Sequence, residues 1–203
     1  MTGTERRVAA FDFDGTITQR DTLLGFLLFV GGRRAVGASL TRRAGGLLRG
    51  MRDDALRDAS KEQVLADVLG GRSVTEVSEA GRRYARLLPE RFRPDIVERL
   101  RWHQAEGHEV VLVSASLEFY LRPVAEELGL TDVIGVEMEN DGEGRLTGRL
   151  ARPNVRAEQK AIRLREWLGD RPAAELWAYG TSSGDDNLLE MADHPTWVGR
   201  RAT

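Results

Sequence analysis

The sequence contains no cysteine in its 203 residues, and this absence excludes several kinds of chemistry. Disulfide bonds, thiolate metal sites and cysteine nucleophiles all require a thiol. A chain without thiols is compatible with a reducing compartment, so we expect a cytoplasmic protein. Its length fits one large domain, or a core domain that carries a smaller insertion.

The chain also lacks an excess of charge of either sign. Thirty basic residues stand against 32 acidic ones, for a formal net charge of -2. Without an overall positive field, we expect no nucleic-acid partner. Between Arg33 and Arg52, basic residues alternate with small apolar ones, a pattern that also suits a membrane surface. A solvated helix face is the preferred interpretation, and no peripheral membrane contact is expected.

Long hydrophobic runs are missing as well. The most apolar stretch, LLGFLLFV from Leu23 to Val30, is far shorter than the roughly 18–20 residues of a transmembrane helix. Acidic residues precede it near the N-terminus, which is not typical of a signal peptide. The sequence therefore predicts neither a membrane span nor a signal peptide.

Histidine and lysine are both scarce. His103, His108 and His194 are spread along the chain and form no cluster that would suggest zinc, so a solvated or capping role is expected for each. Lys61 and Lys160 are the two lysines, and Lys160 lies in a predicted helix. A lone lysine on a helix is more often a solvated surface charge than a functional group.

Strand and helix patterns alternate on both sides of a helix-rich segment. Residues 8–13, 109–116 and 175–180 are apolar and predict buried strands, and 196–199 predicts a last short strand. Segments 95–108, 117–130, 155–170 and 187–193 predict helices, the second interrupted by Pro123. Segments 132–141 and 144–150 predict a strand and a hairpin around 140–144. From 18 to 92 the pattern is helical, with breaks at glycine pairs 31–32, 45–46 and 70–71. This order predicts an α/β fold with a doubly wound parallel sheet and an inserted helical cap.

Polar residues follow three of these strands. Asp12 and Asp14 follow the first, Ser114 to Ser116 the second, and Thr181 to Asp186 a later one. In such sheets, ligands bind outside the carboxyl ends of the strands, which nominates these residues as one site. Two close aspartates suit a hard, oxygen-seeking cation such as Mg²⁺. A carboxylate beside Mg²⁺ can attack a phosphoryl group while a second acid protonates the leaving oxygen.

Four motifs in this order, FDFDGT, VSAS, EQK and YGxSxGD, resemble the haloacid dehalogenase superfamily. The chain is most similar to the subfamily of phosphoserine phosphatase, and the resemblance covers nearly the whole length. It implies a Rossmann-like core of residues 1–17 and 93–203, and an all-helical cap of the C1 type over residues 18–92. The cap would close over the site, exclude water and set the specificity.

The resemblance also implies a role for each matching residue. Asp12 corresponds to the nucleophile, and Asp14 to the general acid and base whose main-chain oxygen is a metal ligand. Ser114 and Lys160 correspond to the residues that bind and neutralise the phosphoryl oxygens, and Asp185 to the second acid of the fourth motif, on the metal side. The substrate-contacting positions implied are Gly15, Thr16, Asp21, Ala115 and Ser116, of which Asp21 corresponds to the residue that reads a substrate amine. Asp186 is expected to face solvent or to favour the start of the next helix.

The sequence departs from the family at Thr181, where the family usually has an aspartate that binds Mg²⁺ directly. Three outcomes are open. Thr181 holds a metal-bound water while Asp12, Asp14 and Asp185 carry the ion; or Asp186 replaces it; or the site binds metal so weakly that the protein is a slow phosphatase or a binder without turnover. The first is preferred, because Mg²⁺ is commonly held by one or two carboxylates with water and phosphate oxygens.

The function expected is therefore a Mg²⁺-dependent phosphomonoester hydrolase that acts through an aspartyl phosphate on a small metabolite such as phosphoserine or histidinol phosphate. Alternatives are a lipid or sugar phosphate phosphatase, a phosphotransferase, and a degenerate member that binds a phosphorylated ligand. The sequence predicts no oligomeric state.

Overall fold

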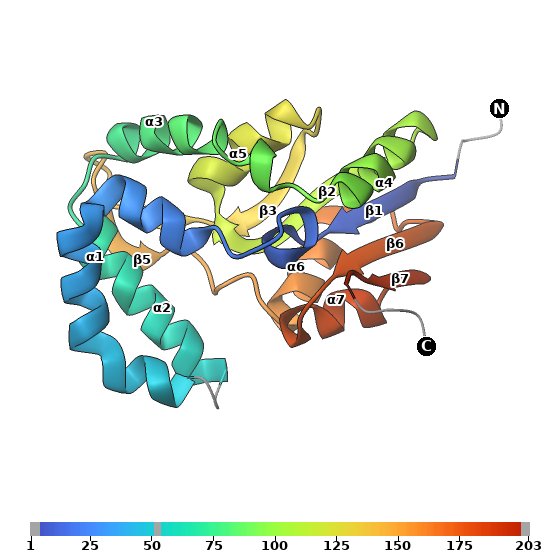
Figure 1. The fold of residues 1–203 in the computed structure, drawn as a ribbon. Coiled ribbons are helices and arrows are strands. Elements are labelled where there is room, and N and C mark those ends of the chain that lie inside the picture. The colour runs from blue at the N-terminus through green and yellow to red at the C-terminus, as the bar shows by residue number, and fades with distance from the viewer. Residues whose placement is uncertain (1–4, 51–53, 200–203) are drawn as a thin grey trace.

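A five-stranded parallel sheet forms the centre of the protein (Figure 1). The computed structural model describes residues 5–50 and 54–199. The strand order is β3-β2-β1-β6-β7, and the four helices α4–α7 flank the sheet. The bounds are β1 Arg7–Phe11, β2 Glu109–Leu117, β3 Asp132–Val136, β6 Glu175–Gly180 and β7 His194–Trp197, with α4 Pro94–Ala105, α5 Glu118–Glu127, α6 Glu158–Leu168 and α7 Asp186–Glu190. The predicted α/β class with a parallel sheet is confirmed.

The position of β1 explains its sequence. It lies at the centre of the sheet and pairs in parallel with β2 on one side and β6 on the other. Val8, Ala9, Ala10 and Phe11 are fully buried, as expected of a strand covered on both faces. The central position also places the chain that follows β1 between the carboxyl ends of β2 and β6.

The inserted segment is helical. It contains α1 (Leu23–Gly50), α2 (Asp54–Leu69), α3 (Val74–Ala85) and a short 3-10 helix (Pro89–Arg91). Of the predicted glycine breaks, Gly32 kinks α1 with a φ of 73°, and Gly71 with a φ of 75° follows the end of α2. The pair at 45–46 does not interrupt α1. Residues 51–53, which include Arg52 of the basic run, lie outside the described residues.

The two crossings between the core and the insert lie side by side. Thr18 pairs with Phe92 in an antiparallel bridge. Gln19 N donates to Arg91 O at 2.9 Å, and Arg93 N donates to Ile17 O at 2.8 Å. We keep the division into a core and a cap at these crossings as a proposal.

A β-hairpin provides a second link between the two parts. Strands β4 (Met138–Asn140) and β5 (Leu146–Leu150) are antiparallel, at the hairpin that the sequence predicts. Gly71 N donates to Leu146 O at 2.7 Å and Val74 N donates to Gly144 O at 2.9 Å, so the hairpin holds the turn between α2 and α3. The insert is therefore held by the hairpin and by the crossings, in addition to the packing of α3 on α5.

Two element predictions are corrected. Helix α5 continues through Pro123 instead of being interrupted. Proline lacks an N–H and leaves the carbonyl four residues earlier, Phe119 O, without its helical partner. Gly81 of α3 packs against this carbonyl so closely that a Cβ there would lie 2.0 Å from the oxygen. Strand β7 begins at His194, earlier than predicted, because Pro195 is tolerated in a strand at the edge of a sheet.

The solvated role predicted for the histidines is wrong for two of them. His103 is fully buried and His108 is 8% exposed. Their Nδ1 atoms are 2.8 Å apart, and His103 Nε2 lies 2.8 Å from the Tyr179 hydroxyl. Burial lowers the pKa of His103 to about 4, so its ring is neutral in the folded protein. These rings pack in the core between α4 and β6 and are not solvated.

One helix among the described residues passes a test for membrane spans by length and composition. It is Leu23–Arg43, within α1, and 22% of the apolar window is buried. No span is predicted from the sequence, because its most apolar stretch, Leu23 to Val30, is far shorter than a transmembrane helix. The result is weak evidence for a span, since core helices of soluble proteins pass the same test.

Candidate active site

A cavity of about 420 Å³ lies at the carboxyl ends of the central strands. Most of the residues predicted for the site line it: Asp12, Asp14, Asp21, Ser114, Ala115, Ser116, Lys160 and Asp185. Five carboxylates and three basic side chains line the cavity. If all are ionised, a phosphate ester would enter a pocket that is already negative, so a bound cation would favour its entry.

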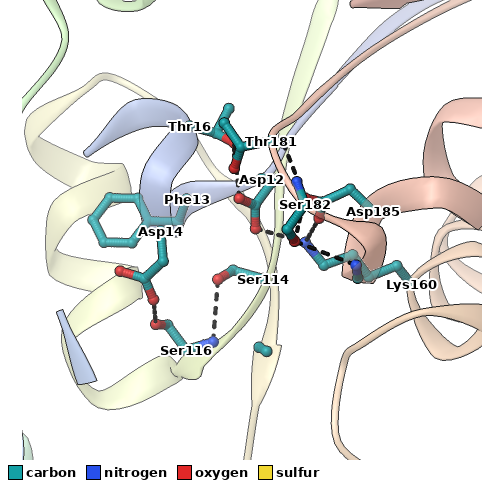
Figure 2. A network of polar contacts seen from close by, with 12 residues as sticks. Asp12, Phe13, Asp14, Thr16, Ser114, Ser116, Lys160, Thr181, Ser182 and Asp185 are labelled. Carbon is teal, nitrogen blue, oxygen red and sulfur yellow. Dashed lines mark hydrogen bonds and ion pairs between the residues drawn. The ribbon is translucent and has the colours of Figure 1, made fainter. Parts of the chain in front are cut away.

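Asp12, Lys160 and Asp185 form the buried centre of the site (Figure 2). Lys160 Nζ lies 2.5 Å from Asp12 Oδ1 and 2.6 Å from Asp185 Oδ1. The side chains of these three residues are 3%, 7% and 2% exposed for Lys160, Asp12 and Asp185. Burial raises the pKa of Asp12 against the opposing effect of Lys160. One lysine thus neutralises two buried carboxylates incompletely.

The turn after β1 holds the other oxygen of Asp12. Thr16 Oγ1 donates to Asp12 Oδ2 at 2.8 Å, and Thr16 is fully buried. The chain reverses tightly enough for this contact because Gly15 adopts a φ of 82°, a conformation that favours glycine. Gly15 and Thr16 are predicted substrate contacts, but they are not among the residues that line the cavity.

Asp14 lies in a separate group of hydroxyls. Its Oδ1 accepts from the Thr22 amide at 2.8 Å and the Thr22 hydroxyl at 2.7 Å, and its Oδ2 accepts from Ser116 Oγ. Burial, followed by the charge of Asp21, raises the pKa of Asp14 to about 6. A carboxyl with this pKa exchanges its proton near neutral pH, which suits a general acid and base.

Ser114 lies between these two groups in the view of Figure 2. Its Oγ accepts from the Ser116 amide at 3.1 Å, and the residue is 1% exposed. In the described part of the chain its hydroxyl proton has no acceptor, so it remains available for an oxygen in the cavity. The neighbouring Ala115 carbonyl is occupied by Lys61.

Lys160 reaches the centre because of how α6 begins. Ala157, just before the helix, has a φ of 49°, which is strained for a residue other than glycine. Its amide donates to Gly184 O at 2.8 Å, which fixes the start of α6 against the loop after β6. The expectation of a solvated surface charge for a lone helix lysine is overridden here, since Lys160 is 2% exposed.

Asp185 is fully engaged within the protein. Its Oδ2 accepts from the amides of Thr181 at 3.0 Å and Ser182 at 2.9 Å, and its Oδ1 contacts Lys160. Burial opposes its ionisation, but Lys160 and these donors lower the pKa of Asp185 overall. Direct metal binding by Asp185 would have to compete with these contacts.

The Thr181 hydroxyl lies beside Thr16, the residue that bonds Asp12. The hydroxyl oxygen of Thr181 is 3.3 Å from that of Thr16, which in turn bonds Asp12 Oδ2. A Cβ on Gly15 would lie 3.0 Å from the same oxygen, so the space there is tight. Asp186 begins α7 and is half-buried, in the first turn, where an acid favours the helix. The described contacts bring Thr181, rather than Asp186, toward Asp12.

The insert contributes residues that the sequence analysis missed. Asp58 and Lys61 of α2 line the cavity, together with Asn154 and Arg156 from the chain before α6. Lys61 Nζ donates to the Ala115 carbonyl and, at 2.7 Å, to Asn154 Oδ1, while Asn154 Nδ2 donates to Asp58 Oδ1 at 2.7 Å. Burial lowers the pKa of Lys61 to about 8. The scarcity of lysine, which drew attention to Lys160, would also have found Lys61.

Asp21 stands at the edge of the cavity and at the start of α1. Its Oδ1 accepts from the Leu23 amide at 3.0 Å, so it caps the helix while its carboxylate borders the cavity. Asp21 is exposed, unlike the carboxylates of the centre. This position leaves it accessible to a group that enters from solvent.

Three features define the class of the protein. They are an α/β core with a parallel sheet, a helical insert, and a buried Asp–Lys–Asp centre at the strand ends. Residues 9–190 match the family described as haloacid dehalogenase-like hydrolase. The chain belongs to this family, which confirms the resemblance seen in the sequence and makes the protein a hydrolase.

Relatives and solved structures agree with this assignment. The chain is 36% identical over 193 residues to protein CicA of Caulobacter vibrioides, covering 94% of this chain and 85% of that protein. It is 32% identical over 102 residues to a histidinol-phosphatase of Neisseria meningitidis, which covers 47% of this chain and 46% of that one. A probable phosphatase of Mycobacterium tuberculosis is 29% identical over 201 residues, with 95% and 69% covered. The phosphatase names support the phosphatase expected from the sequence.

Solved structures share the fold of this chain. A protein of unknown function from Bordetella pertussis superposes with a TM-score of 0.78 at 29% identity, covering 93% of this chain and 88% of that one. A phosphoserine phosphatase captured as a phospho-aspartyl intermediate analogue superposes with a TM-score of 0.62 at 18% identity, covering 93% and 84%. At that identity the second likeness shows the shared fold alone.

Proposed function

We propose that the protein is a Mg²⁺-dependent phosphomonoester hydrolase that acts through a phosphoryl group held on Asp12. The observation that carries the proposal is the position of Asp12, a buried carboxylate at the cavity wall between Lys160 and Thr16. The relatives named as phosphatases support it.

The residues divide the reaction into two steps. A carboxylate oxygen of Asp12 bonds to phosphorus, the bond from phosphorus to the ester oxygen breaks, and Asp14 gives that oxygen a proton. Water then bonds to phosphorus, Asp14 takes a proton from it, and the bond from phosphorus to Asp12 breaks to release phosphate. Lys160 and the Ser114 hydroxyl stabilise the charge on the phosphoryl oxygens in both steps.

The donor set fits Mg²⁺, a hard cation with oxygen ligands. The excess of carboxylates in the cavity and the raised pKa of Asp12 both favour a cation beside this residue. We propose Asp12, the main-chain oxygen of Asp14 and the hydroxyl of Thr181, or a water on it, as ligands. Asp185 belongs to the same side, and its bonds to Lys160 and the 181–182 amides favour a role in holding them. When bound, Mg²⁺ would withdraw charge from the phosphoryl oxygens.

The substrate we propose is a small phosphorylated metabolite with further charged groups, in the manner of phosphoserine or histidinol phosphate. Asp21 and Asp58 at the cavity edge suit an amine, and Lys61 suits an acidic group. A cavity of about 420 Å³ is within the range of small-molecule sites, roughly 300–1,000 Å³. The cytoplasmic location expected from the sequence stays a prediction.

The test is phosphate release from a panel of phosphomonoesters, with Mg²⁺ or with a chelator, for the wild type, Asp12→Asn and Asp186→Asn. Asp186 is the matched control, because it begins α7 nearby and does not line the cavity. We expect Mg²⁺-dependent release that only Asp12→Asn abolishes, and mass spectrometry of the quenched wild type should find the phosphoryl group on Asp12. Release that persists in Asp12→Asn would refute the nucleophile. A folded wild type that binds esters without release would instead support the binding protein that Thr181 leaves open.

A further inference from the structure

The first half of α1 exposes three large apolar side chains to solvent. Leu24, Leu28 and Phe29 are 47%, 38% and 42% exposed, while Phe26 and Leu27, on the other side of the helix, are 0% and 3% exposed. The spacing of the three exposed residues places them on one face of the helix. We call Leu24, Leu28 and Phe29, with the exposed Arg33 and Arg34 that follow the kink at Gly32, the α1 outer face.

The charged residues of α1 have one sign, although Arg42 and Arg43, further along the helix, pair with Asp67 of α2. Helix α1, Leu23–Gly50, contains five arginines and no acidic residue, although the whole chain has a net charge of -2. Arg33 and Arg34 are exposed and make no ion pair among the described residues. From the neighbouring α3, Arg83 places its guanidinium carbon 5.8 Å from the centre of the Phe29 ring. Apolar and positively charged groups therefore occur together.

We propose that the α1 outer face rests on the surface of an anionic phospholipid membrane. Leu24, Leu28 and Phe29 would enter the boundary between headgroups and acyl chains, and the arginines would lie among anionic headgroups. This replaces the expectation of a solvated helix face, which left these apolar side chains out of account. The proposal does not depend on the function of the cavity.

Other occupants fit the face less well. A nucleic acid would satisfy the arginines, but its phosphates offer nothing to three apolar side chains. A second copy of this chain, docked through the same face in a two-fold dimer, would bury Arg33 and Arg34 against a helix that offers them no acidic residue. An anionic membrane is complementary to both kinds of side chain.

The helix lies on the membrane and does not cross it. Arg33 and Arg34 are in the middle of Leu23–Arg43, where two charges would be costly in a bilayer. Gly32 kinks the helix beside them, and α1 packs along α2. These features suit a helix whose inner face belongs to the cap and whose outer face meets the headgroups.

The test is flotation of the protein with phosphatidylcholine vesicles that contain or lack phosphatidylglycerol, at low and high salt. We compare the wild type with Leu28→Glu/Phe29→Glu and Arg33→Glu/Arg34→Glu, and use Arg101→Glu as a matched control, because Arg101 is exposed on α4 of the core. Circular dichroism and thermal unfolding establish that each variant is folded. All five substituted positions lie at the surface, so the folds should be retained.

We expect the wild type and Arg101→Glu to float with phosphatidylglycerol vesicles, and high salt to weaken the association. Reversing both arginines should weaken it by about 30-fold or more, and Leu28→Glu/Phe29→Glu should abolish it. Equal flotation of wild type and both double variants would overturn the proposal, as would failure of the wild type to float at low salt. A dimer in solution that Leu28→Glu/Phe29→Glu dissociates would assign the face to a second copy and also overturn it.

Discussion

Replacing Lys160 by methionine tests the buried centre of the site most directly. Lys160 is the shared partner of Asp12 and Asp185, at 2.5 and 2.6 Å, and all three side chains are at most 7% exposed. Methionine keeps most of the side-chain volume but leaves two buried carboxylates without their cation. Removing one partner of a buried ion pair costs about 3–5 kcal/mol, and we expect Lys160→Met to fall in that range at pH 7.5.

The cost should depend on pH with a definite sign. Lys160 lowers the pKa of both carboxyls, so in the folded variant each has a higher pKa than in the folded wild type. As the pH falls, the folded variant takes up protons before the wild type does and regains stability relative to it. The stability gap between the variant and the wild type should therefore narrow from pH 7.5 to pH 5. Urea unfolding followed by circular dichroism, in chelator and at both pH values, measures it.

A double variant controls for simple loss of packing. Adding Asp185→Asn to Lys160→Met removes one of the two uncompensated charges and should recover part of the lost stability. Asp185→Asn alone should destabilise the wild type, because it leaves Lys160 with one partner. A cost below about 1 kcal/mol at pH 7.5, or a cost that does not change with pH, would refute the reasoning from charge.

Three further predictions concern the cavity. Thr181→Asp should lower the Mg²⁺ concentration needed for the half-maximal rate, because a carboxylate is a better ligand than a hydroxyl; an unchanged requirement would mean that residue 181 does not face the metal. Burial raises the pKa of Asp14 to about 6, so kcat for an alkyl phosphate should fall as the pH rises through about 6, because its leaving oxygen needs a proton. An aryl phosphate has a better leaving group, and its kcat should fall less. Equal profiles for the two esters would argue against Asp14 as the acid. Lys61→Met should raise KM for an acidic ester such as phosphoserine by roughly tenfold and leave KM for a neutral ester near its wild-type value; equal changes would make Lys61 purely structural.

Much of the architecture follows from patterns that physical chemistry fixes locally. The apolar run of β1 is unbroken because the strand is covered on both faces, and its end at Asp12 marks the site without further information. Asp12, Ser114 and Lys160 come from three distant segments, and the rule that ligands bind at the carboxyl ends of parallel strands brings the first two together. The sequence therefore predicts the class of fold and the edge of the sheet that holds the site.

Other features depend on contacts between distant segments and leave no local pattern. Pro123 suggests a break in α5, but the helix continues through it, and Gly81 of α3 packs against the Phe119 carbonyl that the proline leaves without a helical partner. The sequence predicts solvated positions for His103 and His108, but in the fold Tyr179 and Trp177 of β6 pack against them. Lys61 lies on a helix of the insert, and only the packing of α2 near Asn154 brings it to the cavity.

The β4–β5 hairpin has a consequence for how the cavity opens. The insert leaves the core through the paired crossings at Thr18 and Phe92, and the hairpin holds the turn between α2 and α3 through Leu146 and Gly144. Helix α3 also packs on α5, and Lys61 of α2 bonds the Ala115 carbonyl, so a rigid hinge rotation about the crossings would break contacts along several edges. Substrate entry and product exit would then involve a small shear of the helices, unless the hairpin first dissociates from the turn between α2 and α3. In that case, the strength of the hydrogen bonds between the hairpin and this turn would set how fast products leave.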